Sequence, residues 1–159
     1  DTYTRLSTTA YLQWCERVGQ EPVYESYPAH DPCAGAVAAD RLRARPDRPD
    51  AVYGLFDPNG TDLLAAARRY GLRVPDDLLL VCCSESSVYA STEPPITTLS
   101  LKPGKIGTAV VQLLIDAIEG VGATHPVQQI MQTDLIVRTS SQRRTHRTTV
   151  SPPRSPAGG

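Results

Sequence analysis

Two short apolar runs on either side of an amphipathic stretch stand out along the chain. The runs cover residues 51–56 and 78–83, and between them apolar side chains recur at helical spacing over residues 61–70. Continuous apolar runs of this length are typical of strands covered on both faces, which favours a parallel sheet. The pattern therefore predicts a β-α-β unit, with a turn at residues 57–60 and with Gly71 ending the helix.

Similar patterns predict further elements on both sides of this unit. Helical spacing indicates helices over residues 6–18, 34–45 and 103–119. Residues 22–27 alternate enough to predict a strand, residues 84–95 are polar and predict a loop, and residues 127–131 and 134–138 predict two short strands or one bent strand. This alternation predicts an α/β fold of three layers, in which helices cover both faces of a mainly parallel sheet. Gly19 and Gly120 are expected to end the first and last helices.

The composition limits what the chain does alone. With 159 residues and a formal net charge of −1, it has the size of one domain or lobe and no strong attraction to nucleic acid. No run approaches the ~18 apolar residues of a membrane-spanning helix, so no membrane contact is expected. The four cysteines lack the spacing of a metal site or a disulfide scaffold, which favours a reducing cytoplasm. Because the first residue is Asp rather than Met, we expect a piece of a longer protein.

The sequence carries little sign of catalytic chemistry. It contains no Gly-rich phosphate loop, serine elbow or His-Glu-x-x-His motif, so we expect no enzyme, no cofactor and no metal. Adjacent residues of a strand point to opposite faces, so Cys82 and Cys83 are expected to be two buried thiols rather than one site. Asp76 and Asp77 precede a strand, at the amino end of the sheet, where a turn role is expected.

Asp57 has two interpretations. It follows the first apolar run, and ligands of parallel sheets bind beyond the carboxyl ends of the strands. Asp is also a preferred helix N-cap and a common first residue of turns before proline, and the cap preference favours this second interpretation.

The end of the chain is polar. From Ser140 onward apolar side chains almost disappear, and residues 142–159 are predicted to be a disordered tail. Arginines of the tail are suited to DNA phosphates, but no aromatic side chain accompanies them, which favours a solvated extension.

Several motifs occur together in a fixed order. They are Ala-Val-Tyr-Gly-Leu-Phe-Asp at residues 51–57, Tyr-Gly-Leu-Arg-Val-Pro-Asp-Asp at 70–77, Leu-Leu-Leu-Val at 78–81 and Pro-Pro-Ile-Thr-Thr at 94–98. In this order the chain resembles the effector-binding core of LacI/GalR-like bacterial transcription regulators, roughly over residues 5–141. The resemblance implies a periplasmic-binding-protein-like C-terminal lobe over residues 1–101. It also implies a helix over residues 102–122 that crosses back to a second lobe, and closing strands over residues 123–141.

The resemblance also implies an effector pocket. Its expected residues are Ser7, His30, Phe56, Asp57, Ser84 and Glu85. The family's polar pattern is only partly kept, because Ser7 stands in place of an Arg and Phe56 in place of an Asn. Two alternatives follow: an effector less polar than a sugar, with Phe56, His30 and Tyr89 as an apolar wall, or a pocket that has lost its ligand.

The function implied is the ligand-sensing and dimerisation part of a cytoplasmic DNA-binding regulator. Its expected partners are a small effector, sugar-like or less polar, a second copy of the chain, and operator DNA only through an N-terminal head outside this chain. The alternatives are the solute-binding protein of a sugar transporter and a lobe that serves only for oligomerisation. By resemblance, residues 61–70 and 78–83 are expected to carry the dimer contact. The helix over residues 103–119 is expected to be poorly packed or self-associating.

Overall fold

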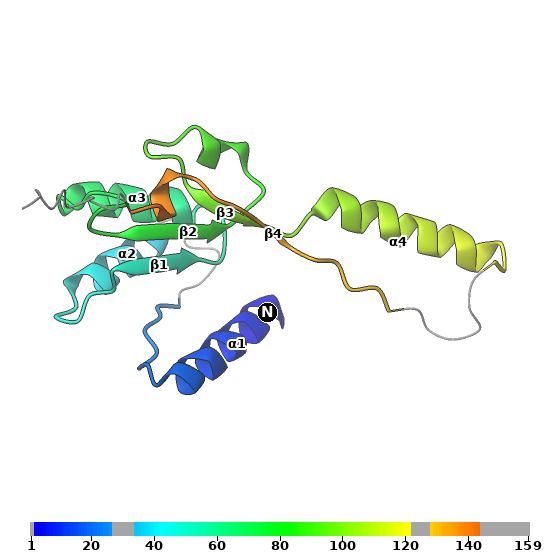
Figure 1. The fold of residues 1–159 in the computed structure, drawn as a ribbon, viewed down its shortest axis with the longest axis horizontal. Helices are drawn as coiled ribbons and strands as arrows, with labels where there is room; N and C mark the ends of the chain where they lie inside the picture. The colour runs from blue at the N-terminus through cyan, green and yellow to red at the C-terminus, as the bar shows by residue number, and fades with distance from the viewer. Residues whose placement is uncertain (1, 27–33, 122–127, 144–159) are drawn as a thin grey trace, which may run out of the picture.

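The structure, a computed structural model, describes residues 2–26, 34–121 and 128–143 (Figure 1). The α-helices are α1 (Thr2–Val18), α2 (Ala34–Ala44), α3 (Asn59–Arg69) and α4 (Pro103–Ile118). The strands are β1 (Ala51–Gly54), β2 (Leu79–Cys83), β3 (Thr97–Ser100) and β4 (Asp134–Ile136). Two short 3-10 helices are η1 (Ser87–Ala90) and η2 (Thr139–Ser141). None of these described helices is both long enough and apolar enough to cross a membrane.

The described strands form a four-stranded sheet in the order β1-β2-β3-β4. β1 pairs with β2 and β2 with β3 in parallel, and β4 is antiparallel to β3. The sheet is therefore mainly parallel, as predicted. The sequence pattern predicted a loop at residues 84–95 and no strand after it. The strand β3, which follows this loop, was therefore missed. Only the second of the two short strands expected near residues 127–138 is present within residues 128–138, as β4.

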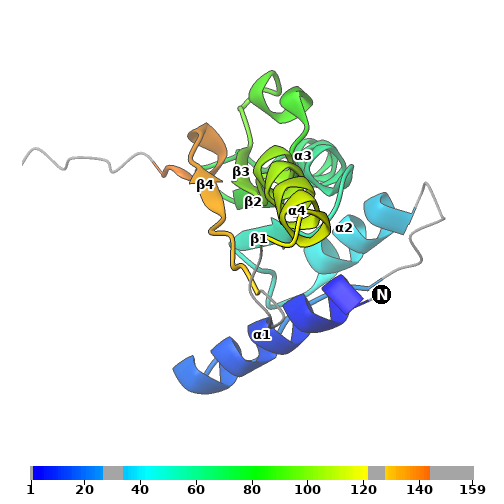
Figure 2. The ribbon, with the colours of Figure 1, turned by 90° about the vertical axis from the view of Figure 1, so that its right-hand side faces the viewer.

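Helices α2 and α3 lie side by side on one face of the sheet (Figures 1 and 2). The core between them and the sheet includes Leu64 from α3 and the fully buried side chains Leu80 and Cys82 from β2. Close packing requires glycine at residue 60, where an added Cβ would lie 2.8 Å from the Cys82 Sγ. The start of α3, and Asp57 just before it, is thereby held against the carboxyl end of β2.

The other face of the sheet is covered less completely. Helix α1 meets it through its first turn, where the Tyr3 hydroxyl donates to the Cys83 Sγ at 3.2 Å. Tyr53, on the same face of β1, keeps 47% of its surface exposed. The three layers predicted from the sequence are present, but α1 contributes little burial to the third.

Glycines end three helices in the predicted way. Gly19, Gly71 and Gly120 follow α1, α3 and α4 with φ of +69°, +67° and +69°. This left-handed conformation strains any residue with a Cβ, and it lets the next backbone N–H groups return to the last carbonyl oxygens of the helix. After α1, for example, Gln20 N donates to Cys15 O at 2.9 Å.

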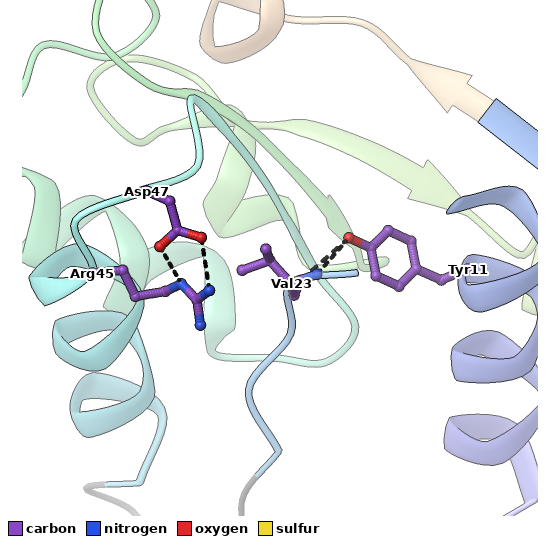
Figure 3. Close-up of polar contacts among 4 residues, drawn as sticks. All are labelled: Tyr11, Val23, Arg45 and Asp47. Atoms are coloured by element: carbon purple, nitrogen blue, oxygen red, sulfur yellow. Dashed lines mark hydrogen bonds and ion pairs between the residues drawn. The ribbon is translucent and has the colours of Figure 1, made fainter. Parts of the chain in front are cut away.

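The strand predicted at residues 22–27 is wrong for its described part. Residues 20–26 have no regular secondary structure, and Tyr27 lies outside the described residues. The Tyr11 hydroxyl forms hydrogen bonds with both backbone groups of Val23, accepting from its N–H at 3.1 Å and donating to its carbonyl oxygen at 3.3 Å (Figure 3). A strand needs a neighbour that pairs with these groups. In the described structure a side chain replaces that neighbour.

The turn that leads from α2 towards β1 is held by an ion pair. The Arg45 guanidinium donates through Nε and Nη2 to both oxygens of Asp47, at 3.1 and 2.9 Å (Figure 3). The Arg45 side chain holds the pKa of the Asp47 carboxyl below its usual value. Both groups are exposed, so this fork fixes local geometry rather than a core contact.

Helix α4 projects from the body of the chain (Figure 1). It buries none of its residues, and Val110, Leu114 and Ile118 are 58%, 59% and 76% exposed. The prediction of a poorly packed helix is confirmed. Self-association of this helix stays a prediction.

The strand expected in the dimer contact is an interior one. β2 has β1 on one edge and β3 on the other, and Leu80 and Cys82 are fully buried. Within the described sheet β2 therefore has no free edge for pairing with a second copy, and the dimer contact expected at residues 78–83 stays a prediction. Of the two elements, α3 retains an outer surface that includes Arg68 and Arg69.

The polar end of the chain begins with a residue that belongs to the core. Ser140 is fully buried, in η2, although the sequence pattern becomes polar from this residue onward. Arg143 forms an ion pair with Asp50 at 3.0 Å. Residues 144–159, most of the tail predicted to be disordered, lie outside the described residues.

Candidate ligand-binding site

A pocket of about 300 Å³ lies where β1, β2 and β3 end. Its lining consists of Tyr3, Leu55, Phe56, Asp57, Cys83, Ser84, Glu85 and Leu101. Four of the six expected residues, namely Phe56, Asp57, Ser84 and Glu85, are thus brought together. They meet because parallel strands end at one edge of the sheet, and the segments after β1 and β2 leave at neighbouring points.

Asp57 faces a hydroxyl group and does not cap α3. The N-cap position is Pro58, without a side-chain cap, so the cap interpretation of Asp57 is wrong. Instead the Ser84 hydroxyl donates to the Asp57 Oδ2 at 3.0 Å. The turn is closed by Asn59, whose side-chain oxygen accepts from the Phe56 N–H at 2.9 Å. Local sequence favours the cap role of Asp57, but Ser84, which directly follows β2, supplies a hydrogen-bond donor from 27 residues away.

Tyr89 supports Asp57 from the core side. Its ring is 2% exposed, and its hydroxyl accepts from the Gly60 N–H at 3.2 Å. Burial, and then the hydrogen bond to Asp57, raises the pKa of Tyr89 well above its usual value. The expectation that Tyr89 belongs to the apolar wall of the pocket is therefore wrong: its ring packs in the core behind Asp57.

Glu85 is tied to the residues that follow β3. Its Oε1 accepts from the Leu101 N–H at 2.7 Å, and its Oε2 accepts from the Ser100 hydroxyl at 3.1 Å. The side chain is nevertheless exposed towards the pocket that it lines. One carboxylate thus faces both the pocket and the start of the connection to α4.

The apolar wall of the pocket is made by Tyr3 and Phe56. Their ring centroids are 5.6 Å apart in an edge-to-face arrangement, a favourable geometry for aromatic pairs. Tyr3 also contacts Cys83 through its hydroxyl. Burial is the main cause that raises the pKa of Tyr3. Sequence reasoning missed Tyr3 because the helical pattern placed the helix start at residue 6, whereas α1 begins at Thr2.

Two expected site residues are not among the lining residues. Ser7 lies one helical turn after Tyr3 and is half-buried, and its hydrogen bond to Tyr3 partly offsets the rise in the pKa of Tyr3. His30 lies outside the described residues. Ser7 and His30 therefore stay predictions as site residues.

The two adjacent cysteines behave as the strand geometry predicts. Cys82 faces α3 and is fully buried, and burial raises the pKa of its thiol to about 12. Cys83 faces Tyr3 from the opposite side of the sheet. Both are free thiols, and they do not form one site together.

The charges around the pocket have one sign. Asp57 and Glu85 carry carboxylates, and no Lys or Arg is among the described residues of the lining. Elsewhere in the described ranges, no group of three or more His, Cys, Asp or Glu side chains is arranged to hold a metal ion. The lining is suited to a ligand that donates hydrogen bonds and carries an apolar face.

Residues 1–141 match the family described as periplasmic binding protein-like domain. The chain belongs to this family. Among its curated relatives, the HTH-type transcriptional regulator CelR of Thermobifida fusca is 35% identical over 107 residues, which cover 67% of this chain and 31% of CelR. The HTH-type transcriptional repressor CytR of Escherichia coli (strain K12) is 32% identical over 111 residues, which cover 69% of this chain and 32% of CytR. The chain thus spans about a third of the length of these relatives.

Solved structures agree with this assignment to the periplasmic binding protein-like family. A LacI family transcriptional regulator from Bifidobacterium animalis subsp. lactis superposes with a TM-score of 0.77 at 26% identity, covering 89% of this chain and 51% of that one. The complex of the regulator CelR with cellobiose gives a TM-score of 0.69 at 32% identity, covering 82% and 40%. The predicted fold and the resemblance to LacI/GalR-like regulators are confirmed.

Proposed function

We propose that the chain is the ligand-sensing and dimerisation part of a cytoplasmic DNA-binding transcriptional regulator. Operator DNA would be bound only through a head outside these 159 residues, in keeping with a net charge of −1. The observation that carries the proposal is the pocket at the ends of β1, β2 and β3, lined by Phe56, Asp57, Ser84 and Glu85. The names of CelR and CytR, a transcriptional regulator and a transcriptional repressor, favour this role over that of a transporter's solute-binding protein.

The ligand that suits this pocket is small, uncharged and rich in hydroxyl groups, with one apolar face. Asp57 and Glu85 accept hydrogen bonds, and the rings of Tyr3 and Phe56 supply an apolar surface on which a sugar ring can stack. Because the described lining contains no Lys or Arg, an anionic ligand would meet the two carboxylates without compensation from these residues. Cellobiose, which CelR binds in its solved complex, is therefore a reasonable first probe.

The regulatory effect would be a population shift. A ligand changes the balance between two arrangements of a regulator only if it binds one of them more tightly. A pocket formed at the strand ends of one lobe, with α4 leading away from it, is a suitable place for such a differential contact.

The proposal is tested by NMR titration of the isotope-labelled chain with cellobiose. We expect saturable shift changes at the amides of residues 55–57 and 83–86, and an affinity at least ~10-fold lower for cellobionate, which adds a carboxylate to a ligand of similar size. Asp57→Asn and Ser84→Ala should weaken binding of cellobiose. Ser91→Ala, an exposed change outside the pocket lining, serves as the matched control.

Other outcomes separate the alternatives. Equal binding of cellobiose and cellobionate would contradict the role given to the two carboxylates. If a panel of neutral sugars and less polar hydroxylated compounds causes no shifts while the chain forms dimers, the lobe serves for oligomerisation only and the sensing proposal is wrong.

A further inference from the structure

We propose that Glu85 is the positioning residue that couples the pocket to α4: its carboxylate holds the connection into that helix, and a ligand bound to it stiffens the connection. The inference rests on the proposed function for its ligand. The hold itself is a property of the chain and can be tested without a ligand.

The connection is residues 100–102, from the end of β3 to the start of α4, and three hydrogen bonds hold it. The Glu85 carboxylate accepts from the Leu101 N–H at 2.7 Å and from the Ser100 hydroxyl at 3.1 Å. The same Ser100 Oγ accepts from the Lys102 N–H at 3.2 Å. Residues 100–102, which lead from β3 into α4, are thus bonded directly or through one hydroxyl to a side chain of the pocket.

Helix α4 depends on this connection for its orientation. It buries none of its residues among the described ones, so no core packing within them holds it against the body. Lys102, just before the helix, has a φ of 55°, a left-handed conformation that is unfavourable for a residue with a side chain. The Lys102 ammonium forms an ion pair with Asp134 of β4 at 2.8 Å, which adds a second tie to the sheet. Figure 1 shows α4 leaving the body at this point.

A ligand can reach Glu85 without breaking these bonds. An ionised carboxylate has about four acceptor positions, and two are occupied by Ser100 and Leu101. The side chain is exposed on the pocket side. Hydroxyl donors of a ligand would take the remaining positions and restrict the carboxylate, which orders the groups bonded to it. The expected effect is a stiffer connection, not a released one.

The experiment is amide hydrogen exchange by NMR on the full 159-residue chain, with and without cellobiose. In Glu85→Ala without ligand, exchange of the Leu101 and Lys102 amides should accelerate about 10- to 100-fold, as expected for loss of a hydrogen bond to a charged group. The 15N order parameters of α4 should fall relative to those of β2. Glu85→Gln, which keeps an acceptor for the Leu101 N–H, should restore part of the protection.

Two controls separate a local effect on residues 100–102 from general unfolding and from the loss of any carboxylate. Amides of Leu80 and Cys82 in the central strand should stay protected in every variant, which excludes general unfolding. Glu119→Ala removes an exposed carboxylate beyond the far end of α4 and should leave the Leu101 and Lys102 amides unchanged. Cellobiose should slow their exchange in the wild-type chain but not in Glu85→Ala.

The two proposals fail in different ways. If cellobiose and related sugars do not bind, the chosen ligand class is wrong, yet faster exchange in Glu85→Ala would still establish the hold on α4. If Glu85→Ala leaves both amides and the order of α4 unchanged, or if the ligand protects them equally in that variant, the coupling role of Glu85 is overturned even where binding is tight.

Discussion

Ser140 donates its hydroxyl to the carbonyl oxygen of Leu80 at 2.5 Å, across 60 residues of sequence. The Ser140 Oγ also accepts from the Thr97 N–H at 2.8 Å, so one fully buried hydroxyl bridges β2 and the start of β3. Ser140→Ala would leave a buried N–H and a buried carbonyl oxygen unpaired. We expect this change to lower the free energy of unfolding by about 1–3 kcal/mol.

Urea denaturation followed by circular dichroism checks this prediction. The control is Ser91→Ala, because Ser91 is exposed and its hydroxyl takes no such bridging position. The two midpoints should differ clearly. Equal midpoints would mean that another group replaces the Ser140 hydroxyl between the strands.

Gly60 should tolerate no side chain. An added Cβ would lie 2.8 Å from the Cys82 Sγ and 2.9 Å from Cε1 of Tyr89, both in the core. Gly60→Ala therefore overpacks the contact between α3 and β2, and we expect a loss of about 1–3 kcal/mol in the free energy of unfolding. Since Tyr89 also supports Asp57, the amide signals around the pocket should shift in an NMR spectrum.

A second glycine gives a control of opposite sign. At Gly107, within α4, an added Cβ meets nothing within 4 Å. Gly107→Ala should raise the helix content of α4, because Ala is the better helix former by roughly 1 kcal/mol. A Gly60→Ala variant as stable as the wild type would show that the Tyr89 ring moves aside at little cost.

The sequence predicted those features that depend on local pattern. The runs at residues 51–56 and 78–83, the helix between them and the glycines that end three helices all appear in the structure. Convergence of Phe56, Asp57, Ser84 and Glu85 was predictable from the resemblance together with the rule that parallel strands end at one edge.

The features that were missed depend on partners far away in the sequence. β3 is short and largely polar, yet Thr97 and Thr98 are buried because Arg138 and Ser140 supply their hydrogen bonds from 40 or more residues later. Asp57 does not cap α3 as expected, and instead accepts from the hydroxyl of Ser84, which directly follows β2. Pattern and propensity contain no information about such contacts, which exist only once the sheet has formed.

Asp77 should make stability depend on pH in the acidic range. Hydrogen bonds from the Arg73 side chain, and then from its backbone N–H, lower the pKa of the Asp77 carboxyl from 3.8 to about 2. The folded state therefore favours the ionised form. This contribution is fully present above pH 3.8 and is lost as the pH falls towards 2.

NMR titration of the side-chain carboxyl carbon and urea midpoints at two pH values check this. The midpoint of the wild type should fall more between pH 4.5 and 2 than that of Asp77→Asn, because the variant has no carboxylate to lose. In Arg73→Gln the pKa of Asp77 should move part of the way back, since the backbone donor remains. An unchanged Asp77 pKa in that variant would rule out the guanidinium as the main cause.

The exposed apolar side of α4 should bring two copies of the chain together. Val110, Leu114 and Ile118 are all more than half exposed, and burying one such side chain is worth about 1.5–3 kcal/mol. We expect the apparent mass in sedimentation equilibrium to rise with concentration. Leu114→Glu should weaken the association at least ~10-fold, because a charge would then be buried at the contact.

Thr108→Glu adds the same charge on the polar side of the helix and should have little effect. If both variants associate like the wild type, the contact lies elsewhere, and α3, with its outer surface of Arg68 and Arg69, becomes the element to test.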